Sequence, residues 1–136
     1  MEISKVWFDD EYIYVENTDG ETLRQSLLWY ENLRNATDEQ RNHYTVGHDG
    51  LHWRELDEDI SFESFYYPDA EPTRLQHFFL THKEINVAEF AKRIGMNPSL
   101  LRNYINGFKS PSKEREEMIL DSVAELGEEY VALRHE

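Results

Sequence analysis

Bulky apolar residues alternate with polar ones near the start of the chain, which is the pattern of half-buried β-strands. The alternation predicts strands over residues 3–8, 12–16 and 21–26. Asp19-Gly20 lies between the last two and favours a tight hairpin turn. Three antiparallel strands form a sheet with one face that needs cover. Apolar residues that repeat at helical spacing over 27–33 are expected to supply that cover.

The following segment continues this mixed pattern. Thr37 and Gln40 have the spacing of a capping box, which predicts the start of a short helix. Two glycines within 44–53 bracket a turn, with short strands expected on either side. The proline-bracketed stretch 67–72 marks a boundary. The pattern therefore predicts an α+β domain over residues 1–69, built from a small antiparallel sheet with helices.

Beyond the boundary, apolar residues recur at helical spacing, which predicts an all-α domain over residues 73–136. Thr73 and Gln76 form a further capping box, and Ser112 (or Ser110) is expected to cap a later helix. We expect Gly127 to stop that helix before a short tail helix. The residues expected to face inward on it are Met118, Ile119, Val123 and Leu126, and the tail is Tyr130, Val131 and Leu133.

The most informative stretch, residues 86–107, holds two short helices with their start and stop signals. Asn86 can cap the first helix, and Glu89 stands where a capping box would be completed. Gly95 supplies the left-handed residue that ends it. Asn97, followed by proline, opens the second helix. Helix, tight glycine turn, helix is the pattern of a helix-turn-helix unit. The apolar stripe expected on the second helix is Leu101, Tyr104, Ile105 and Phe108.

The polar face of the second helix is the candidate binding surface. Its members recur at i, i+3, i+4 and i+7, so they project together: Ser99, Arg102, Asn103 and Asn106. Arginine can form two hydrogen bonds with guanine, and asparagine two with adenine. Any amphipathic helix also has a polar outer face, so this pattern alone does not distinguish a DNA-binding surface from an ordinary solvent-exposed one. The local charge favours the DNA-binding interpretation. Between Thr81 and Lys113 the sequence has six Lys or Arg and two Glu, a net charge of +4 in a chain of net charge −14.

The C-terminal part resembles the Cro/lambda-repressor class of helix-turn-helix domains, and especially the short form that ends many HicB-type antitoxins. The resemblance is carried by Phe90-Ala91-Lys92-Arg93-Ile94-Gly95-Met96-Asn97, then Leu101, Tyr104 and Gly107, then Lys109-Ser110-Pro111-Ser112. It implies a unit of four or five helices. In related regulators a terminal helix or the additional domain makes the dimer. One position departs from the class, because Val87 stands where a phosphate-gripping glutamine is frequent.

The N-terminal part resembles the bacterial DUF2442 family of small α+β domains of unknown function. The motifs are Asp19-Gly20, Gly50-Leu51-His52-Trp53 and Asp57-Glu58-Asp59-Ile60-Ser61. Some members of this family carry a helix-turn-helix at the C-terminus. The resemblance implies a fold but no established chemistry.

Charge is distributed unevenly along the chain. Residues 1–72 carry 5 Lys or Arg against 18 Asp or Glu, a net of −13, and residues 73–136 carry 9 against 10, a net of −1. An acidic domain repels phosphate. It could attract a basic partner protein, although acidity also serves solubility. The chain has no cysteine, which excludes disulfides and fits a reducing cytosol. It shows no signal peptide and no membrane-spanning run, so we expect a cytoplasmic protein without a membrane partner.

Other chemistry finds little support. His43, His48 and His52 with Asp49 invite a metal site, but their spacing matches no standard one, and surface histidines are the default. The acidic residues of 55–63 lack the glycine and alternating ligands of a calcium loop. No nucleophile motif, phosphate loop or dinucleotide fingerprint is present, so we expect no enzyme, cofactor or metal. The residues expected to form the core beneath the sheet include Trp7, Trp29 and Trp53.

These patterns favour a sequence-specific DNA-binding transcriptional regulator, and the HicB-type resemblance suggests an antitoxin-like autoregulator. Double-stranded DNA would be bound by a homodimer spanning two half-sites. The residues expected to contact bases are Ser99, Arg102, Asn103 and Asn106, and those expected to meet phosphates are Lys92, Arg93 and Lys109. The alternative is a non-catalytic, acidic interaction module that neutralises a basic partner protein, such as a toxin, without binding DNA.

Overall fold

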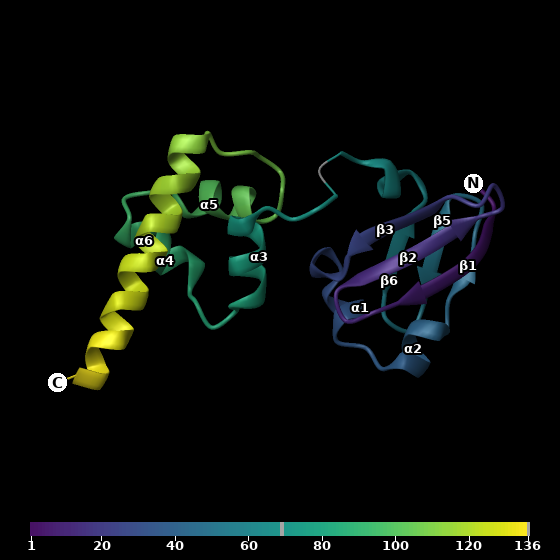
Figure 1. The fold of residues 1–136 in the computed structure, drawn as a ribbon, viewed down its shortest axis with the longest axis horizontal. Helices are drawn as coiled ribbons and strands as arrows, with labels where there is room; N and C mark the ends of the chain where they lie inside the picture. Colours follow the sequence, from purple (N-terminus) through teal and green to yellow (C-terminus); the bar gives the residue numbers. More distant parts are fainter. Residues whose placement is uncertain (69, 136) are drawn as a thin grey trace. The chain divides into compact units, whose positions relative to one another are not determined.

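The computed structural model describes residues 1–68 and 70–135. The chain forms two compact units, Met1–Pro72 and Thr73–Glu136. Figure 1 follows the chain from its purple N-terminus, through the mixed unit, to the yellow C-terminal helix. The first unit contains two small antiparallel sheets with short helices, and the second is mainly helical.

The first sheet has the predicted three antiparallel strands. They are β1 (Ile3–Phe8), β2 (Tyr12–Asn17) and β3 (Thr22–Ser26), in the order β1-β2-β3. Ile13 and Val15 are fully buried, whereas Tyr12 and Tyr14 point to the opposite face, as the two-residue period of a strand requires. The β2–β3 turn contains Gly20 at φ 84°, a left-handed conformation that favours glycine.

The remainder of this unit supplies a second sheet and short helical turns. Its elements are η1 (Leu27–Trp29), α1 (Glu31–Arg34), α2 (Asp38–Asn42), β4 (Thr45–Val46), β5 (Gly50–Trp53), β6 (Glu58–Ser61) and η2 (Glu63–Tyr66). The helical segment predicted over 27–33 is divided, because Tyr30 leaves the helical region with φ −129° and ψ 75°. Its hydroxyl donates to the Gln25 side-chain carbonyl at 2.7 Å. The capping box of Thr37 and Gln40 is confirmed.

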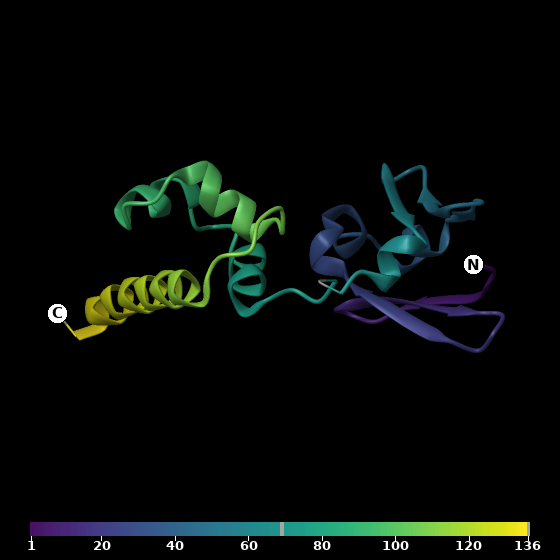
Figure 2. The ribbon, with the colours of Figure 1, turned by 90° about the horizontal axis from the view of Figure 1, so that it is seen from above.

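One apolar core joins the two sheets of this unit. Its fully or largely buried members are Ile13, Val15, Leu27, Leu33, Leu51, Trp53, Ile60, Phe62 and Phe65. In Figure 2 the short helices and the second sheet lie on one side of β1–β3. No element that the structure describes within this unit covers the opposite face of β1–β3.

The three tryptophans have different surroundings, so the expectation of a shared core was only partly right. Trp53 is buried, and its indole N–H donates to the Arg41 carbonyl at 2.8 Å. Trp29 is half-buried and donates to the carbonyl of Ala70. Trp7 lies on the outer sheet face, stacked on Tyr14 with ring centroids 5.4 Å apart. Strand alternation explains this difference, because Val6 and Phe8 pack against the core and Trp7 stands between them.

The second unit consists of helices α3 (Arg74–Thr81), α4 (Val87–Arg93), α5 (Pro98–Ile105) and α6 (Lys113–Ala132), followed by η3 (Leu133–His135). The capping box of Thr73 and Gln76 is confirmed, and Ser112 caps α6. The buried residues of this unit are Leu75, Phe79, Leu80, Phe90, Ala91, Met96, Leu101, Tyr104, Ile105 and Ile119. They come from all four helices and from the turn after α4.

Two predicted inward positions face solvent instead. Phe108 is 80% exposed, because Gly107 at φ 82° turns the chain away from the axis of α5. Met118 is also exposed, whereas its neighbour Ile119 is fully buried. The helical period placed Met118 and Ile119 on the same broad apolar stripe of α6. Only one of them is buried, because the contact of α6 with the other helices is narrow.

Helix α6 does not stop at Gly127, contrary to prediction; it continues to Ala132. A glycine inside a helix costs only about 1 kcal/mol relative to alanine, and the neighbouring Glu, Leu and Ala residues favour helix. Tyr130 and Val131 are therefore exposed residues near the end of α6 rather than part of a separate helix, and Leu133 begins η3. No helix in the described part of the chain is both long and apolar enough to cross a membrane.

Candidate nucleic-acid interface

The candidate interface is built on α4, α5 and the turn between them. The Asn86 side-chain oxygen accepts the Glu89 backbone N–H at 3.1 Å, which caps α4. The predicted capping box is not completed, because the Glu89 carboxylate bonds to Lys92 at 3.2 Å instead. Gly95, at φ 72°, ends the helix, and the Met96 amide donates back to the Ala91 carbonyl at 2.8 Å. This pairing is the glycine-dependent helix stop expected from the sequence.

Helix α5 begins and ends with the same kinds of local signal. The Asn97 side-chain oxygen accepts the N–H groups of Ser99 at 2.8 Å and Leu100 at 3.3 Å. At the other end, the carbonyl of Asn103 accepts the amides of Phe108 at 2.9 Å and Lys109 at 3.2 Å. These bonds fold the chain after α5 back on its last turn and leave Lys109 exposed there.

The buried face of α5 fixes which side chains face outward. Leu101 is fully buried, and Tyr104 and Ile105 are nearly so. The Gln76 side-chain amide of α3 also donates to the Tyr104 carbonyl at 3.1 Å. Because these contacts hold one side of α5, its rotation about its own axis is set within the helical unit.

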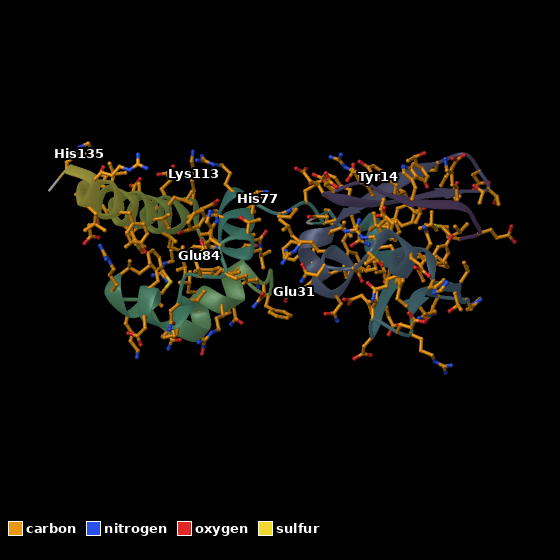
Figure 3. The ribbon with its side chains drawn as sticks, turned by 90° about the horizontal axis from the view of Figure 1, so that it is seen from below. Tyr14, Glu31, His77, Glu84, Lys113 and His135 are labelled. Carbon is orange, nitrogen blue, oxygen red and sulfur yellow. The ribbon has the colours of Figure 1, made fainter. Side chains whose placement is uncertain are left out.

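The opposite face carries the four predicted base-contacting residues. Ser99, Arg102 and Asn106 are exposed, and Asn103 is half-buried. No carboxylate among the described residues lies within salt-bridge distance of Arg102 or Lys109. Glu84, labelled in Figure 3, is an acidic residue of the segment between α3 and α4 and does not lie on α5. The face therefore offers a guanidinium and amides without local acidic competition.

The other two predicted phosphate contacts are paired within the unit. Lys92 lies 3.2 Å from Glu89, one turn earlier on α4. Arg93 forms an ion pair with Glu129 of α6. All four side chains are exposed, so each pair contributes at most about 1 kcal/mol and can exchange one anion for another. Sequence reasoning missed the second pair because its members are 36 residues apart.

The histidines considered for a metal lie in the mixed unit. His52 Nδ1 is 2.7 Å from an Asp59 oxygen, and its Nε2 is 3.4 Å from Asp49. The hydrogen bond to Asp59 raises the pKa of His52 above its ordinary value, against an opposing effect of desolvation. His43 lies 3.9 Å from Glu55, and His48 is exposed. No three His, Asp or Glu side chains of residues 1–68 and 70–135 form a metal-binding group.

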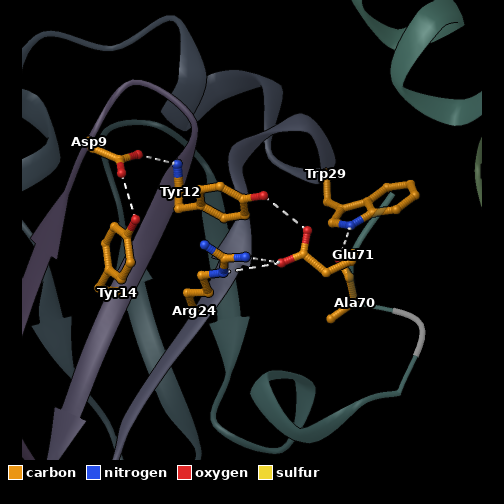
Figure 4. Close-up of polar contacts among 7 residues, drawn as sticks. All are labelled: Asp9, Tyr12, Tyr14, Arg24, Trp29, Ala70 and Glu71. Carbon is orange, nitrogen blue, oxygen red and sulfur yellow. Dashed lines mark hydrogen bonds and ion pairs between the residues drawn. The ribbon is translucent and has the colours of Figure 1, made fainter. Parts of the chain in front are cut away.

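A polar network on the outer face of β1–β3 was not anticipated. Figure 4 shows the carboxylate of Glu71 accepting the Tyr12 hydroxyl at 3.0 Å and pairing with Arg24 at 3.1 Å. Asp9 accepts the Tyr14 hydroxyl at 2.6 Å, and this bond lowers the pKa of the Asp9 carboxyl. The strand pattern places the two tyrosines on one face, but nothing local links them to Glu71. The network ties the end of this unit to its first sheet.

A comparison with protein families identifies the first unit. The family described as Protein of unknown function (DUF2442) matches residues 3–71, just over half of the chain. The chain belongs to the DUF2442 family. The match ends at Glu71, the residue that closes the network with Tyr12 and Arg24, and it does not extend into the helical unit. No curated protein and no solved structure matches the chain.

Two of the three motifs that suggested the DUF2442 resemblance, residues 50–53 and 57–61, lie in β5, β6 and the turn between them, whereas Asp19-Gly20 lies in the β2–β3 turn of the first sheet. Gly50 and Leu51 of β5 pair with Ser61 and Ile60 of β6. A side chain at Gly50 would lie only 2.3 Å from the Ile60 carbonyl oxygen, so the close approach of the two strands requires glycine. Asp57 adopts φ 51° in the turn between these strands. Strand packing therefore explains the glycine of this motif.

Proposed function

We propose that the helical unit is a lambda-repressor-like helix-turn-helix domain and that the protein is a sequence-specific transcriptional regulator of the antitoxin-like, autoregulating kind. The observation that carries this proposal is the outer face of α5, where Arg102 is exposed without a carboxylate partner among the described residues, together with Ser99 and Asn106. In this function α5 enters the major groove of double-stranded DNA. Arg102 donates two hydrogen bonds to guanine, and the asparagines recognise adenine.

Phosphate contacts complete the proposed interface. Lys109, four residues after α5, has no carboxylate partner among the described residues and can contact phosphate directly, whereas Lys92 and Arg93 exchange their carboxylate partners for phosphates. Three or four phosphates per subunit is a modest number, so this contribution to affinity is modest, and log K falls with log salt concentration with a slope of about −3. A homodimer on two half-sites about 34 Å apart supplies the remaining affinity. The proposal involves no catalysis and no cofactor, and such a regulator acts in the cytoplasm.

Fluorescence anisotropy with the full-length protein tests this function. The duplex carries the sequence upstream of the protein's own gene, and a shuffled duplex measures non-specific binding. We expect Arg102→Ala to weaken binding to the upstream duplex at least about fivefold, since a bidentate base contact is worth about 1–3 kcal/mol. Arg134→Ala, in η3 and also at an exposed position, is the matched control. Equal affinity of the wild type for both duplexes at low salt would contradict sequence-specific regulation.

The second candidate function is a protein-interaction module. It is favoured by the ion pairs that already occupy Lys92 and Arg93, and by the net charge of −13 over residues 1–72, which carry 5 basic against 18 acidic residues. In this function the DUF2442 domain neutralises a basic partner such as a toxin, and the helical unit only docks or dimerises. Co-expression with a small basic protein encoded beside its gene would yield a stable complex. The module is supported if that complex forms and no promoter duplex is bound at any salt concentration.

A further inference from the structure

A pocket of about 250 Å³ opens in the helical unit beside the outer face of α5. It lies between the C-terminal end of α3, the segment that leads into α4, and the last turn of α5. Its lining residues are Phe79, Leu80, Lys83, Ile85, Val87, Arg102, Ile105 and Asn106. None of these side chains makes an ion pair in the described structure.

The lining has two chemically distinct parts. The apolar part combines buried Phe79, Leu80 and Ile105 with half-buried Ile85 and Val87. The polar part consists of exposed side chains: Lys83, Arg102 and Asn106. Two cations and an amide beside an apolar wall suit a ligand with an apolar chain and an anionic head, because the guanidinium fork matches a carboxylate.

The volume limits the size of that ligand. A water molecule occupies about 30 Å³ in the liquid, so the pocket accommodates about eight non-hydrogen atoms. A carboxylate group takes three of these, which leaves a chain of about five carbon atoms. Larger amphipathic anions would extend into solvent.

We propose that this pocket binds a short-chain aliphatic carboxylic acid, with the chain against Ile85 and Val87 and the carboxylate held by Arg102 and Lys83. Resting on the DNA-binding function proposed above, the acid acts as an effector that releases DNA. Arg102 cannot hold the carboxylate and two guanine acceptors at once, so the two ligands compete. This role also accounts for a valine at the first position of α4, since a polar side chain there would remove part of the apolar wall.

The binding step is tested without DNA, by methyl NMR of the full-length protein titrated with hexanoate. We expect saturable shifts of the Leu80, Ile85, Val87 and Ile105 methyl signals, with a dissociation constant on the order of 1 mM for so small a ligand. The signals of Ile13 and Val15, in the core of the DUF2442 domain, serve as internal controls. Hexanol, which has the same chain without the charge, is expected to bind at least tenfold more weakly. Equal binding of hexanol, or no saturable shift with hexanoate, would overturn the proposal.

Matched variants identify the groups responsible. Lys83→Gln and Arg102→Gln should each weaken hexanoate binding several-fold, whereas Lys113→Gln and Arg134→Gln should not. Val87→Gln should weaken it as well, and Val131→Gln, at an exposed position of α6, is the control. Amide NMR spectra establish whether each variant is folded. If Val87→Gln does not fold, Lys83→Gln and Arg102→Gln, at exposed positions, test the site. Unchanged affinity in both Lys83→Gln and Arg102→Gln would refute the proposed site.

A competition experiment tests the effector role separately. Hexanoate at about ten times its dissociation constant should release the upstream duplex from the wild type, whereas release from Lys83→Gln should require a several-fold higher hexanoate concentration. If the wild type binds hexanoate but no duplex, the DNA-binding function fails while the acid site stands. If DNA binds and hexanoate does not displace it, the effector role is wrong.

Discussion

Arg93 of α4 forms an ion pair with Glu129 of α6. The pair joins the first helix of the proposed DNA-binding motif to the long terminal helix of the same unit. It also occupies one of the three cations expected to meet phosphates. Among the described residues, Glu129 is the carboxylate of α6 that pairs with a cation of the candidate interface.

Removing that carboxylate should strengthen DNA binding. Glu129→Gln frees Arg93 for a phosphate, so we expect several-fold tighter binding and a salt dependence steeper by about 0.9 in log–log slope. Anisotropy titrations at several salt concentrations measure both quantities. Glu128→Gln makes the same change in net charge at a carboxylate that has no ion pair in the described structure. If both variants tighten binding equally, only net charge matters and the pair has no specific role.

Lys109 should contribute affinity without sequence preference. It is exposed after the turn at Gly107 and, in the described structure, has no carboxylate partner. We expect Lys109→Gln to weaken binding to the upstream and shuffled duplexes by the same factor and to reduce the salt slope by about 0.9. Arg102→Ala should instead weaken binding mainly to the upstream duplex. Loss of specificity in Lys109→Gln would assign this lysine to a base rather than to a phosphate.

His52 should make the stability of the DUF2442 domain depend on pH. Its hydrogen bond to Asp59 raises its pKa in the folded state. The pair therefore stabilises the fold fully below the ordinary histidine pKa of about 6.5, and this stabilisation is lost as pH rises through the folded value.

NMR titration of the histidine ring signals measures this shift directly. We expect Asp59→Asn to lower the pKa of His52, and the difference in unfolding free energy between wild type and variant to shrink from about pH 6 to pH 8. His48, exposed and unpaired in the described structure, is the reference ring. A difference that does not change with pH would show that the pair does not contribute through charge.

Two glycines of the helical unit should respond oppositely to alanine. Gly95 has φ 72°, so alanine there is strained by about 1–2 kcal/mol even though the surrounding space is open. Gly127 lies inside α6 with open space around it, and alanine should stabilise that helix by about 0.5–1 kcal/mol. Urea unfolding followed by circular dichroism compares the two. A stabilising Gly95→Ala would contradict the left-handed conformation.

The burial pattern along α6 and η3 predicts a sharp contrast between two of their residues. Ile119→Ala should destabilise the helical unit by about 2–5 kcal/mol, because this side chain is fully buried. Leu133→Ala should change stability by less than about 0.5 kcal/mol, since Leu133 is 70% exposed. All three tryptophans belong to the DUF2442 domain, so tryptophan fluorescence reports that domain separately and should not change. A large effect of Leu133→Ala would reveal a partner for the end of α6.

The sequence by itself determined the elements whose signals are local. Asn97 and Ser112 cap the helices that follow them, and Gly95 ends the first short helix of the 86–107 stretch. Each signal acts within about five residues, so no distant contact is needed to interpret it. Strand alternation likewise separated Ile13 from its outward-facing neighbours. The same local period placed the candidate base-contacting residues on one face of α5.

The tertiary structure decided what depends on residues far apart in the chain. It paired Arg93 with Glu129 across 36 residues and Glu71 with Tyr12 across 59. It also buried Ile119 while leaving Phe108 in solvent. A periodic pattern shows that a helix has an apolar side, but burial depends on which other surface meets that side. Local sequence encodes backbone conformation, whereas packing between distant segments selects the partners of each side chain.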